Sequence, residues 1–151
     1  MAVRVQREDF DLGAELAALR AGRTDIGALV SFTGLVRDLE GRLTGFELEH
    51  YPAMTEKALA GIEAEAQARW PLQATLIVHR FGPLAPGEQI MMVATASAHR
   101  AAAFAAAEFL MDYLKSRAPF WKKETTAAGA GWVAARDEDE AALDRWSSAG
   151  A

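Results

Sequence analysis

Hydrophobic residues recur at roughly every third or fourth position in three segments of the chain, and this spacing predicts three helices. An acidic run near the end of the chain predicts the start of a fourth helix. The predicted helices cover residues 9–20, 55–70, 98–118 and 137–146. Gly22, Pro71 and Pro119 follow the first three helices, and these residue types commonly stand where helices end. The fourth helix opens on four consecutive carboxylates, which interact favourably with the positive end of a helix dipole.

Segments rich in apolar and β-branched residues separate the helices and predict strands. They cover residues 26–36, 44–51, 74–81, 89–96, 120–126 and 132–135. The apolar run 26–36 predicts a buried strand, whereas apolar and polar residues alternate over 44–51 as in a half-exposed strand. The polar residues 38–42 predict a turn between these two strands.

The loop between the strands predicted at 74–81 and 89–96 carries Gly82-Pro83 and Pro86-Gly87, which favour tight turns. We therefore expect these two strands to pair antiparallel. Helices and turn-linked strand pairs follow one another without repeats or linkers. This order predicts a single α+β domain over residues 1–151 and not a doubly wound parallel sheet.

The composition indicates a globular protein. A chain of 151 residues, half of them hydrophobic, can bury a core without disulfides or a structural metal. The net charge of -5 and the pI near 5.2 argue against general nucleic-acid binding, which usually requires a basic face. No apolar run approaches the ~18 residues that span a bilayer, and the N-terminus has no signal-peptide pattern. These features predict a cytoplasmic protein.

The chain contains no cysteine, and its three histidines lie far apart at positions 50, 79 and 99. The absence of thiols excludes a cysteine nucleophile, a thiolate metal site and a protein-bound persulfide. Dispersed histidines likewise argue against a transition-metal site, so neither a metal nor another cofactor is expected. His50 and His79 lie within predicted strands and are interpreted as core or hydrogen-bonded residues.

Three of the four lysines gather between positions 115 and 123. Lys115 and Arg117 fall in the last turn of the helix predicted over 98–118, where cations stabilise the negative end of the dipole. A structural role for these two cations is therefore as well supported by the pattern as a functional role.

Lys122 and Lys123 are neighbours in a predicted strand, so their side chains point to opposite faces. Only one of them can share a pocket with Lys115. Lys122 is the candidate, with Phe120 and Glu124 on its face. In the alternative interpretation, the two lysines lie on a solvated edge strand and discourage that edge from pairing with another strand.

His99 and Arg100 lie at the start of the helix predicted over 98–118, where cations are unfavourable unless an anion binds beside them. The pair predicts a phosphate or carboxylate pocket, with a surface arginine beside a partly buried histidine as the alternative. Sixteen residues of helix separate His99 from Lys115 by ~24 Å. If both serve one small anionic ligand, two subunits must supply them.

Arg37 follows the apolar run 26–36 and comes shortly after the small residues Thr33 and Gly34. Such a cation either reaches over the floor of a site or lies exposed in a turn. The residues alone thus predict an acidic α+β domain with a local cationic site for a phosphorylated or carboxylate ligand, and they do not identify a reaction.

Five collinear blocks closely resemble the large, catalytic subunit of molybdopterin synthase. The blocks are VSFTGLVRD (30–38), LEHYPAMTEKAL (48–59), HRFGPLAPGE (79–88), SAHRAAAF (97–104) and MDYLKSRAPFWKKE (111–124). The match extends from about Val30 to Trp146 in the family's order and nearly in its spacing.

This resemblance implies an α/β-hammerhead fold and a sulfurtransferase in molybdenum cofactor biosynthesis. Two sulfurs would pass from the thiocarboxylated C-terminal Gly-Gly of a small ubiquitin-like subunit to cyclic pyranopterin monophosphate, which yields molybdopterin. The family's large subunits form a homodimer with a small subunit at each end, a heterotetramer. A sulfurtransferase without cysteine must receive its sulfur on a partner, in agreement with the composition.

The resemblance also implies a set of site residues. The family's substrate-binding positions fall on Arg37, His99, Arg100, Lys115 and Lys122. Further substrate-binding candidates are their neighbours Leu35, Val36, Lys123 and Glu124. Lys115 and Lys122 are the catalytic candidates.

In the family the histidine–arginine pair enters the pocket from the neighbouring subunit, and a lysine often occupies the position of Leu35. The alternative to an enzyme is a non-catalytic binding protein for a ubiquitin-like partner or a phosphorylated metabolite.

Overall fold

The computed structural model describes residues 2–38, 43–118, 120–126, 129–133 and 137–147. The elements follow in the order β1 (Ala2–Gln6), α1 (Leu12–Arg20), β2 (Ala28–Leu35), β3 (Leu43–His50), α2 (Pro52–Arg69), β4 (Leu72–Arg80), β5 (Gly82–Leu84), β6 (Gln89–Ser97), α3 (Arg100–Arg117), β7 (Phe120–Thr126), β8 (Gly129–Val133) and α4 (Asp137–Ser147). The α+β class and the four predicted helices are confirmed within these residues. The short strands β1 and β5 were not predicted.

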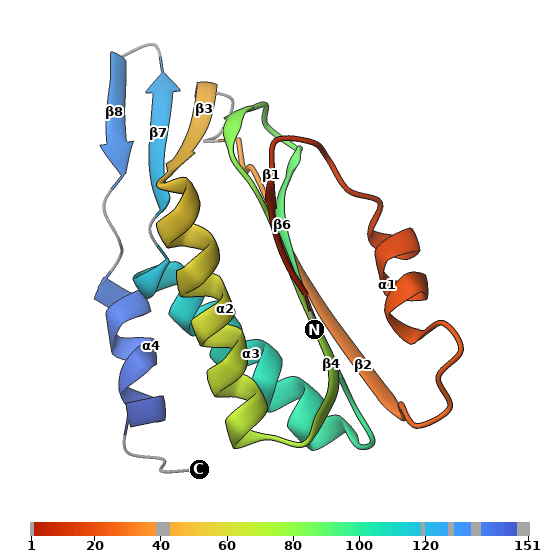
Figure 1. Cartoon of the computed structure of the whole chain (residues 1–151). Helices are drawn as coiled ribbons and strands as arrows, with labels where there is room; N and C mark the ends of the chain where they lie inside the picture. The colour runs from red at the N-terminus through yellow and green to blue at the C-terminus, as the bar shows by residue number, and fades with distance from the viewer. Residues whose placement is uncertain (1, 39–42, 119, 127–128, 134–136, 148–151) are drawn as a thin grey trace.

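The larger sheet has the strand order β1-β4-β6-β2. It lies between α1 on one face and α2 and α3 on the other (Figure 1). The predicted antiparallel pairing of β4 with β6 is confirmed, and β1 joins β4 in parallel. Apolar side chains from both faces of β4 and β6 fill the core, including Ile77 and Val93 toward the helices and Val78 and Met92 toward α1.

The smaller sheet has the order β5-β3-β7-β8 and is antiparallel throughout its described pairs. In β3, Phe46 and Leu48 are buried while Glu49 is exposed, which confirms the half-exposed strand predicted from alternation. The loop predicted between β4 and β6 contains β5, which crosses to this sheet and pairs with β3. The two sheets are therefore joined directly after Arg80.

The prediction that residues 26–36 form a buried strand is wrong. β2 borders the larger sheet, pairs with β6 alone among the described strands, and leaves Phe32 and Leu35 42% and 55% exposed. Its apolar character is typical of a strand that is covered on both faces, but strand order depends on distant parts of the chain. The predicted turn at 38–42 falls largely on residues 39–42, which lie outside the described residues.

α3 carries the positions of greatest interest, and its boundaries agree closely with the prediction. His99 is its N-cap residue and makes no side-chain capping bond, and Lys115 and Arg117 lie in its last turn. α2 begins three residues before the predicted start, because Pro52 fits the first turn of a helix. Among the residues that the structure describes, no helix combines the length and the apolar character needed to cross a membrane.

Candidate functional site

Cations from three separate elements meet in one cavity of about 220 Å³. Arg37 follows β2, Lys115 comes from the last turn of α3, and Lys122 comes from β7. The remaining residues of its wall are Leu35, Val36, Phe46, Ile90 and Glu124. The structure thus brings together six of the nine site residues predicted from the sequence.

The register of β7 explains which side chains reach this cavity. Lys122 pairs with Leu48 of β3 and Glu124 pairs with Phe46, so both stand on the face that packs toward α3. A carboxylate two residues from an amine on the same strand face can orient that amine. The cavity therefore combines a cluster of cations with one acidic side chain.

A second, apolar cavity of about 120 Å³ adjoins the first, and Leu35, Ile90, Lys115 and Lys122 line both. Its other wall residues are mostly apolar, namely Phe32, Gly34, Leu48, His79, Met91, Met111, Leu114, Ala118 and Phe120. The two lysines stand where the apolar wall meets the cationic cavity. This arrangement suits a ligand with an uncharged stem and an anionic end.

His79 forms part of the apolar cavity's wall. Its ring stacks on Phe120 with centroids 3.6 Å apart, and its Nδ1 lies 2.8 Å from the carbonyl oxygen of Arg80. Burial lowers the pKa of His79 to about 4, and the charges of Lys115 and Lys122 act in the same direction. The imidazole is therefore neutral at physiological pH.

Lys123 lies on the opposite face of β7, in a separate hollow of about 480 Å³. Glu47 and Glu88 also line that hollow, so its charge is mixed, and it does not contain the cation cluster. The alternation of Lys122 and Lys123 between two faces is confirmed. The assignment of Lys123 to substrate binding stays a prediction, because the structure does not bring it together with Lys115.

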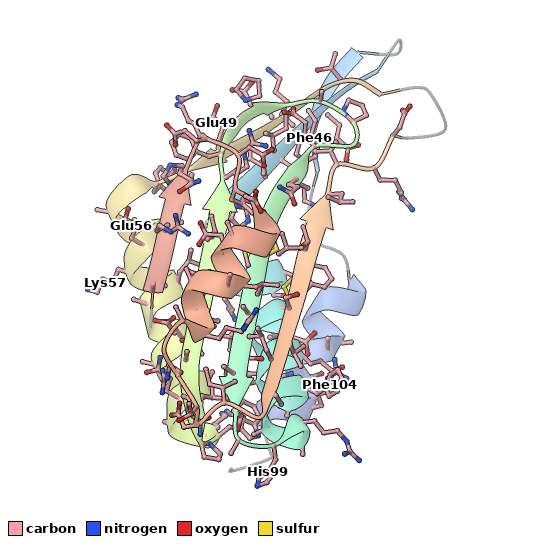
Figure 2. The ribbon with its side chains drawn as sticks, turned by 90° about the vertical axis from the view of Figure 1, so that its right-hand side faces the viewer. Phe46, Glu49, Glu56, Lys57, His99 and Phe104 are labelled. Carbon is pink, nitrogen blue, oxygen red and sulfur yellow. The ribbon has the colours of Figure 1, made fainter. Side chains whose placement is uncertain are left out.

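His99 and Arg100 lie exposed at the N-terminal end of α3, whereas Lys115 lies at its C-terminal end. Figure 2 places His99 at the end of the molecule far from Phe46, which belongs to the cavity wall. Within one chain the structure therefore does not bring the histidine–arginine pair to the cationic cavity.

The segment that leads to His99 is held tightly against the start of β2. The N–H of Gly27 donates to the carbonyl oxygen of Ser97 over 3.0 Å. A Cβ atom on Gly27 would lie only 2.2 Å from the carbonyl oxygen of Ala98. Glycine is required at this position because the two backbone segments touch.

A largely apolar, partly exposed patch lies along the middle of α3 beside β2. We call it the β2–α3 patch; its apolar residues are Val30, Phe32, Phe104, Ala107 and Met111, and Ser31 and Glu108 also line it. Phe104 is 61% exposed and projects outward beside β2 (Figure 2). Apolar side chains that gather at a surface and are partly exposed there often mark interaction sites.

Sequence reasoning missed the contribution of His79, Met111 and Leu114 to the cavity wall. Met111 and Leu114 fall in the helix predicted over 98–118, which was not assigned to a cavity wall at these positions, and His79 was interpreted as a core or hydrogen-bonded residue. A titratable residue inside the apolar run of β4 was the available signal. Within the described ranges no group of three His, Asp or Glu side chains is placed to hold a metal ion.

Known proteins are similar to this chain in both sequence and fold. The family model described as MoaE protein matches residues 5–117. A molybdopterin synthase catalytic subunit of Cereibacter sphaeroides is 64% identical over 97% of this chain and 100% of its own length.

Two solved structures extend the likeness to the fold. The molybdopterin biosynthesis MoaE protein from Burkholderia ambifaria has a TM-score of 0.84 at 60% identity and covers 97% of both chains. Molybdopterin synthase from Staphylococcus aureus has a TM-score of 0.79 at 34% identity, over 87% of this chain and 96% of that one. The family match spans most of the chain and the relatives span nearly all of it, so the chain belongs to the MoaE protein family.

Proposed function

We propose that this chain is the catalytic subunit of a molybdopterin synthase, the activity named for its relatives. It transfers two sulfurs from the thiocarboxylated C-terminus of a small ubiquitin-like subunit to cyclic pyranopterin monophosphate. The observation that carries the proposal is the meeting of Arg37, Lys115 and Lys122 beside an apolar cavity. Because the chain has no cysteine, the sulfur must arrive on a partner.

The apolar cavity accommodates the partner's tail. A C-terminal Gly-Gly has no side chains and can enter a narrow apolar space, and its thiocarboxylate carries the negative charge. Lys115 and Lys122 stand at the boundary of the two cavities, so an anion there meets both amines. Lys115 stabilises the charge that develops during transfer or moves the proton, Lys122 assists, and Glu124 orients Lys122.

The cationic cavity receives the phosphorylated pterin. Arg37 binds the phosphate, and the walls formed by Leu35 and Val36 lie beside it. His99 and Arg100 complete the phosphate site from a second copy of the chain, since α3 keeps them at its far end in the same copy. Lys123 remains a candidate for substrate binding only if the ligand extends around β7.

A dimer through the β2–α3 patch would produce this division of the site. Ala28 of β2 pairs with Ser97, close to His99, whereas Leu35 at the other end of β2 lines the cationic cavity. A two-fold axis through the middle of the patch reverses the direction of β2 and α3 in the second copy. The His99 end of one subunit then approaches the Lys115 end of the other.

Residues 1–151 form one large-subunit domain. Two copies of it make the core of a heterotetramer, which acts in the cytoplasm. The decisive experiment mixes the purified chain with a thiocarboxylated small subunit and the pterin precursor. Product is read as the fluorescence of oxidised molybdopterin. Formation of the complex without product would instead assign the chain to the non-catalytic binding proteins.

Lys115→Ala is the companion variant in this experiment. It should leave partner binding largely intact and abolish product formation. Lys57→Ala is the matched control, because Lys57 is an exposed lysine of α2 that lines none of the cavities described above. A near-normal single-turnover rate for Lys115→Ala would overturn the role given to Lys115.

A further inference from the structure

His79 is held in a single orientation at the wall of the apolar cavity. Its side chain is buried, with the residue only 8% exposed. The ring stacks on Phe120 with an interplanar angle of 16°, and Nδ1 lies 2.8 Å from the carbonyl oxygen of Arg80. Stacking on one face and a hydrogen bond at one edge together prevent the ring from turning.

The bond to Arg80 decides which ring nitrogen carries the hydrogen. A carbonyl oxygen can only accept, so Nδ1 is the donor and Nε2 of the neutral ring carries a lone pair. Among the described residues, the titratable groups whose charges act on the pKa of His79 are Lys115, His50 and Lys122, and none of them is acidic. Burial and these groups keep the pKa of His79 near 4, so Nε2 stays an acceptor at neutral pH.

We propose that His79 is a positioning residue of the sulfur transfer, in which its Nε2 accepts a hydrogen bond from the ammonium group of Lys115. Both residues line the apolar cavity, and of the two lysines Lys115 has the stronger electrostatic effect on the imidazole. The inference rests on the proposed function, because it explains how the amine used in that reaction is aimed.

A neutral acceptor suits this position better than a carboxylate. A carboxylate beside Lys115 would neutralise the amine and repel an incoming anion. The imidazole of His79 orients the ammonium group and leaves its positive charge available to the ligand. Because the ring does not take up a proton near neutral pH, it also does not add a competing charge to the cavity.

Two substitutions test the roles of the two ring nitrogens, Nδ1 and Nε2, separately. His79→Asn keeps a donor near the position of Nδ1, which can still reach the carbonyl of Arg80, and removes the acceptor in the cavity. His79→Gln places its amide near the position of Nε2 and supplies a carbonyl acceptor there. A purely structural role through Arg80 would favour Asn, whereas the proposed role favours Gln.

Single-turnover rates with the thiocarboxylated small subunit and the pterin precursor test which of the two variants is more active. We expect His79→Asn to lose on the order of ten- to a hundredfold in rate, the usual effect of a misplaced reactive group. Precursor binding should change little, the pH profile of the rate should shift, and His79→Gln should recover most of the loss. A wild-type rate and pH profile in His79→Asn, or equal losses in both variants with an unchanged pH profile, would overturn the proposal.

If the wild-type chain itself makes no product, the proposed function fails, independently of the comparison between variants.

Nitrogen NMR of the imidazole tests the contact without turnover. In the folded wild-type chain, the Nε2 resonance of His79 should move in Lys115→Ala and stay in place in Lys57→Ala. The Nδ1 resonance should show a bound hydrogen in all three proteins. An Nε2 resonance that stays in place in Lys115→Ala would overturn the proposed hydrogen bond, even if the chain is active.

Discussion

The indole N–H of Trp146 donates to Oδ2 of Asp112 over 2.6 Å, and this bond ties α4 to α3 three residues before Lys115. Arg145 donates to the same carboxylate oxygen over 2.8 Å. The indole also packs edge-on against Trp70 and Phe109. α4 therefore braces the end of α3 that enters the cationic cavity.

Loss of this brace should destabilise the protein. Trp146→Phe retains most of the ring packing but removes the donor, and we expect a cost of about 1–2 kcal/mol in the free energy of unfolding. Trp146→Ala should cost about 3 kcal/mol or more, because it also removes the aromatic contacts. Urea denaturation measures both, with exposed Asp144→Ala of the same helix as the control. Equal stability of Trp146→Phe and Trp146→Ala would contradict the assignment of part of the effect to packing.

The buried neutral imidazole of His79 should make stability depend on pH. The unfolded chain binds a proton at this side chain near pH 6.5, whereas the folded chain binds it only near pH 4. The contribution is fully present above pH 6.5 and is lost as the pH falls to 4, by roughly 3 kcal/mol. His79→Gln should lack this component in denaturation curves taken between pH 7 and 4. Parallel pH dependence in the two proteins would contradict the burial of a neutral ring.

Mixed dimers should distinguish a shared site from a site within one chain. His99→Ala and Lys115→Ala should each be inactive alone. If the subunits exchange, one of the two sites in each mixed dimer has all its groups, so a random mixture should regain about a quarter of the wild-type activity. Product formation after co-refolding of the two variants is the measurement. No recovery, despite mixed dimers detected by mass spectrometry, would contradict the shared site.

The close contact at Gly27 should make that position intolerant of a side chain. In Gly27→Ala the new methyl group must displace the carbonyl of Ala98, and we expect a cost of about 2 kcal/mol or more. Gly61→Ala is the matched control, since a Cβ there meets nothing within 4 Å in the exposed middle of α2. That variant should gain up to about 1 kcal/mol from helix propensity. Thermal unfolding of the two variants should therefore shift in opposite directions.

The neighbouring lysines of β7 should differ sharply in their importance. Lys122→Ala removes an amine from both cavities of the site and should lower the single-turnover rate on the order of a hundredfold. Lys123→Ala changes the hollow on the other face and should retain a rate close to that of the wild type. Similar losses in both variants would show that the substrate reaches around the strand.

The regular geometry of helices and strands was sufficient to predict two of the separations between site residues. The rise of a helix separates His99 from Lys115 whatever the rest of the fold, and the pleat of a strand separates Lys122 from Lys123. Both separations are present in the structure. The convergence of Arg37 on the same lysines was implied by family resemblance and not by spacing.

Non-local pairing explains what the sequence did not reveal. β1 is held by parallel pairing with β4, and β5 by pairing with β3, and in neither case does the pattern within the short strand identify its partner. The edge position of β2 likewise follows from the strand order of the whole sheet. His79 lines the cavity because Phe120 and Lys115, which come from later elements, form other parts of the same wall. The residue spacing within β4 holds no information about the position of those later elements.

The strict two-residue repeat of β7 also limits how this segment can evolve. Lys122 and Lys123 occupy different faces because of their order along one paired strand. Inserting or deleting one residue between Phe120 and Lys122 would exchange the two amines between the faces and turn Glu124 away from the cavity. We therefore expect lineages of this enzyme to accept substitutions in β7 far more readily than changes in its length.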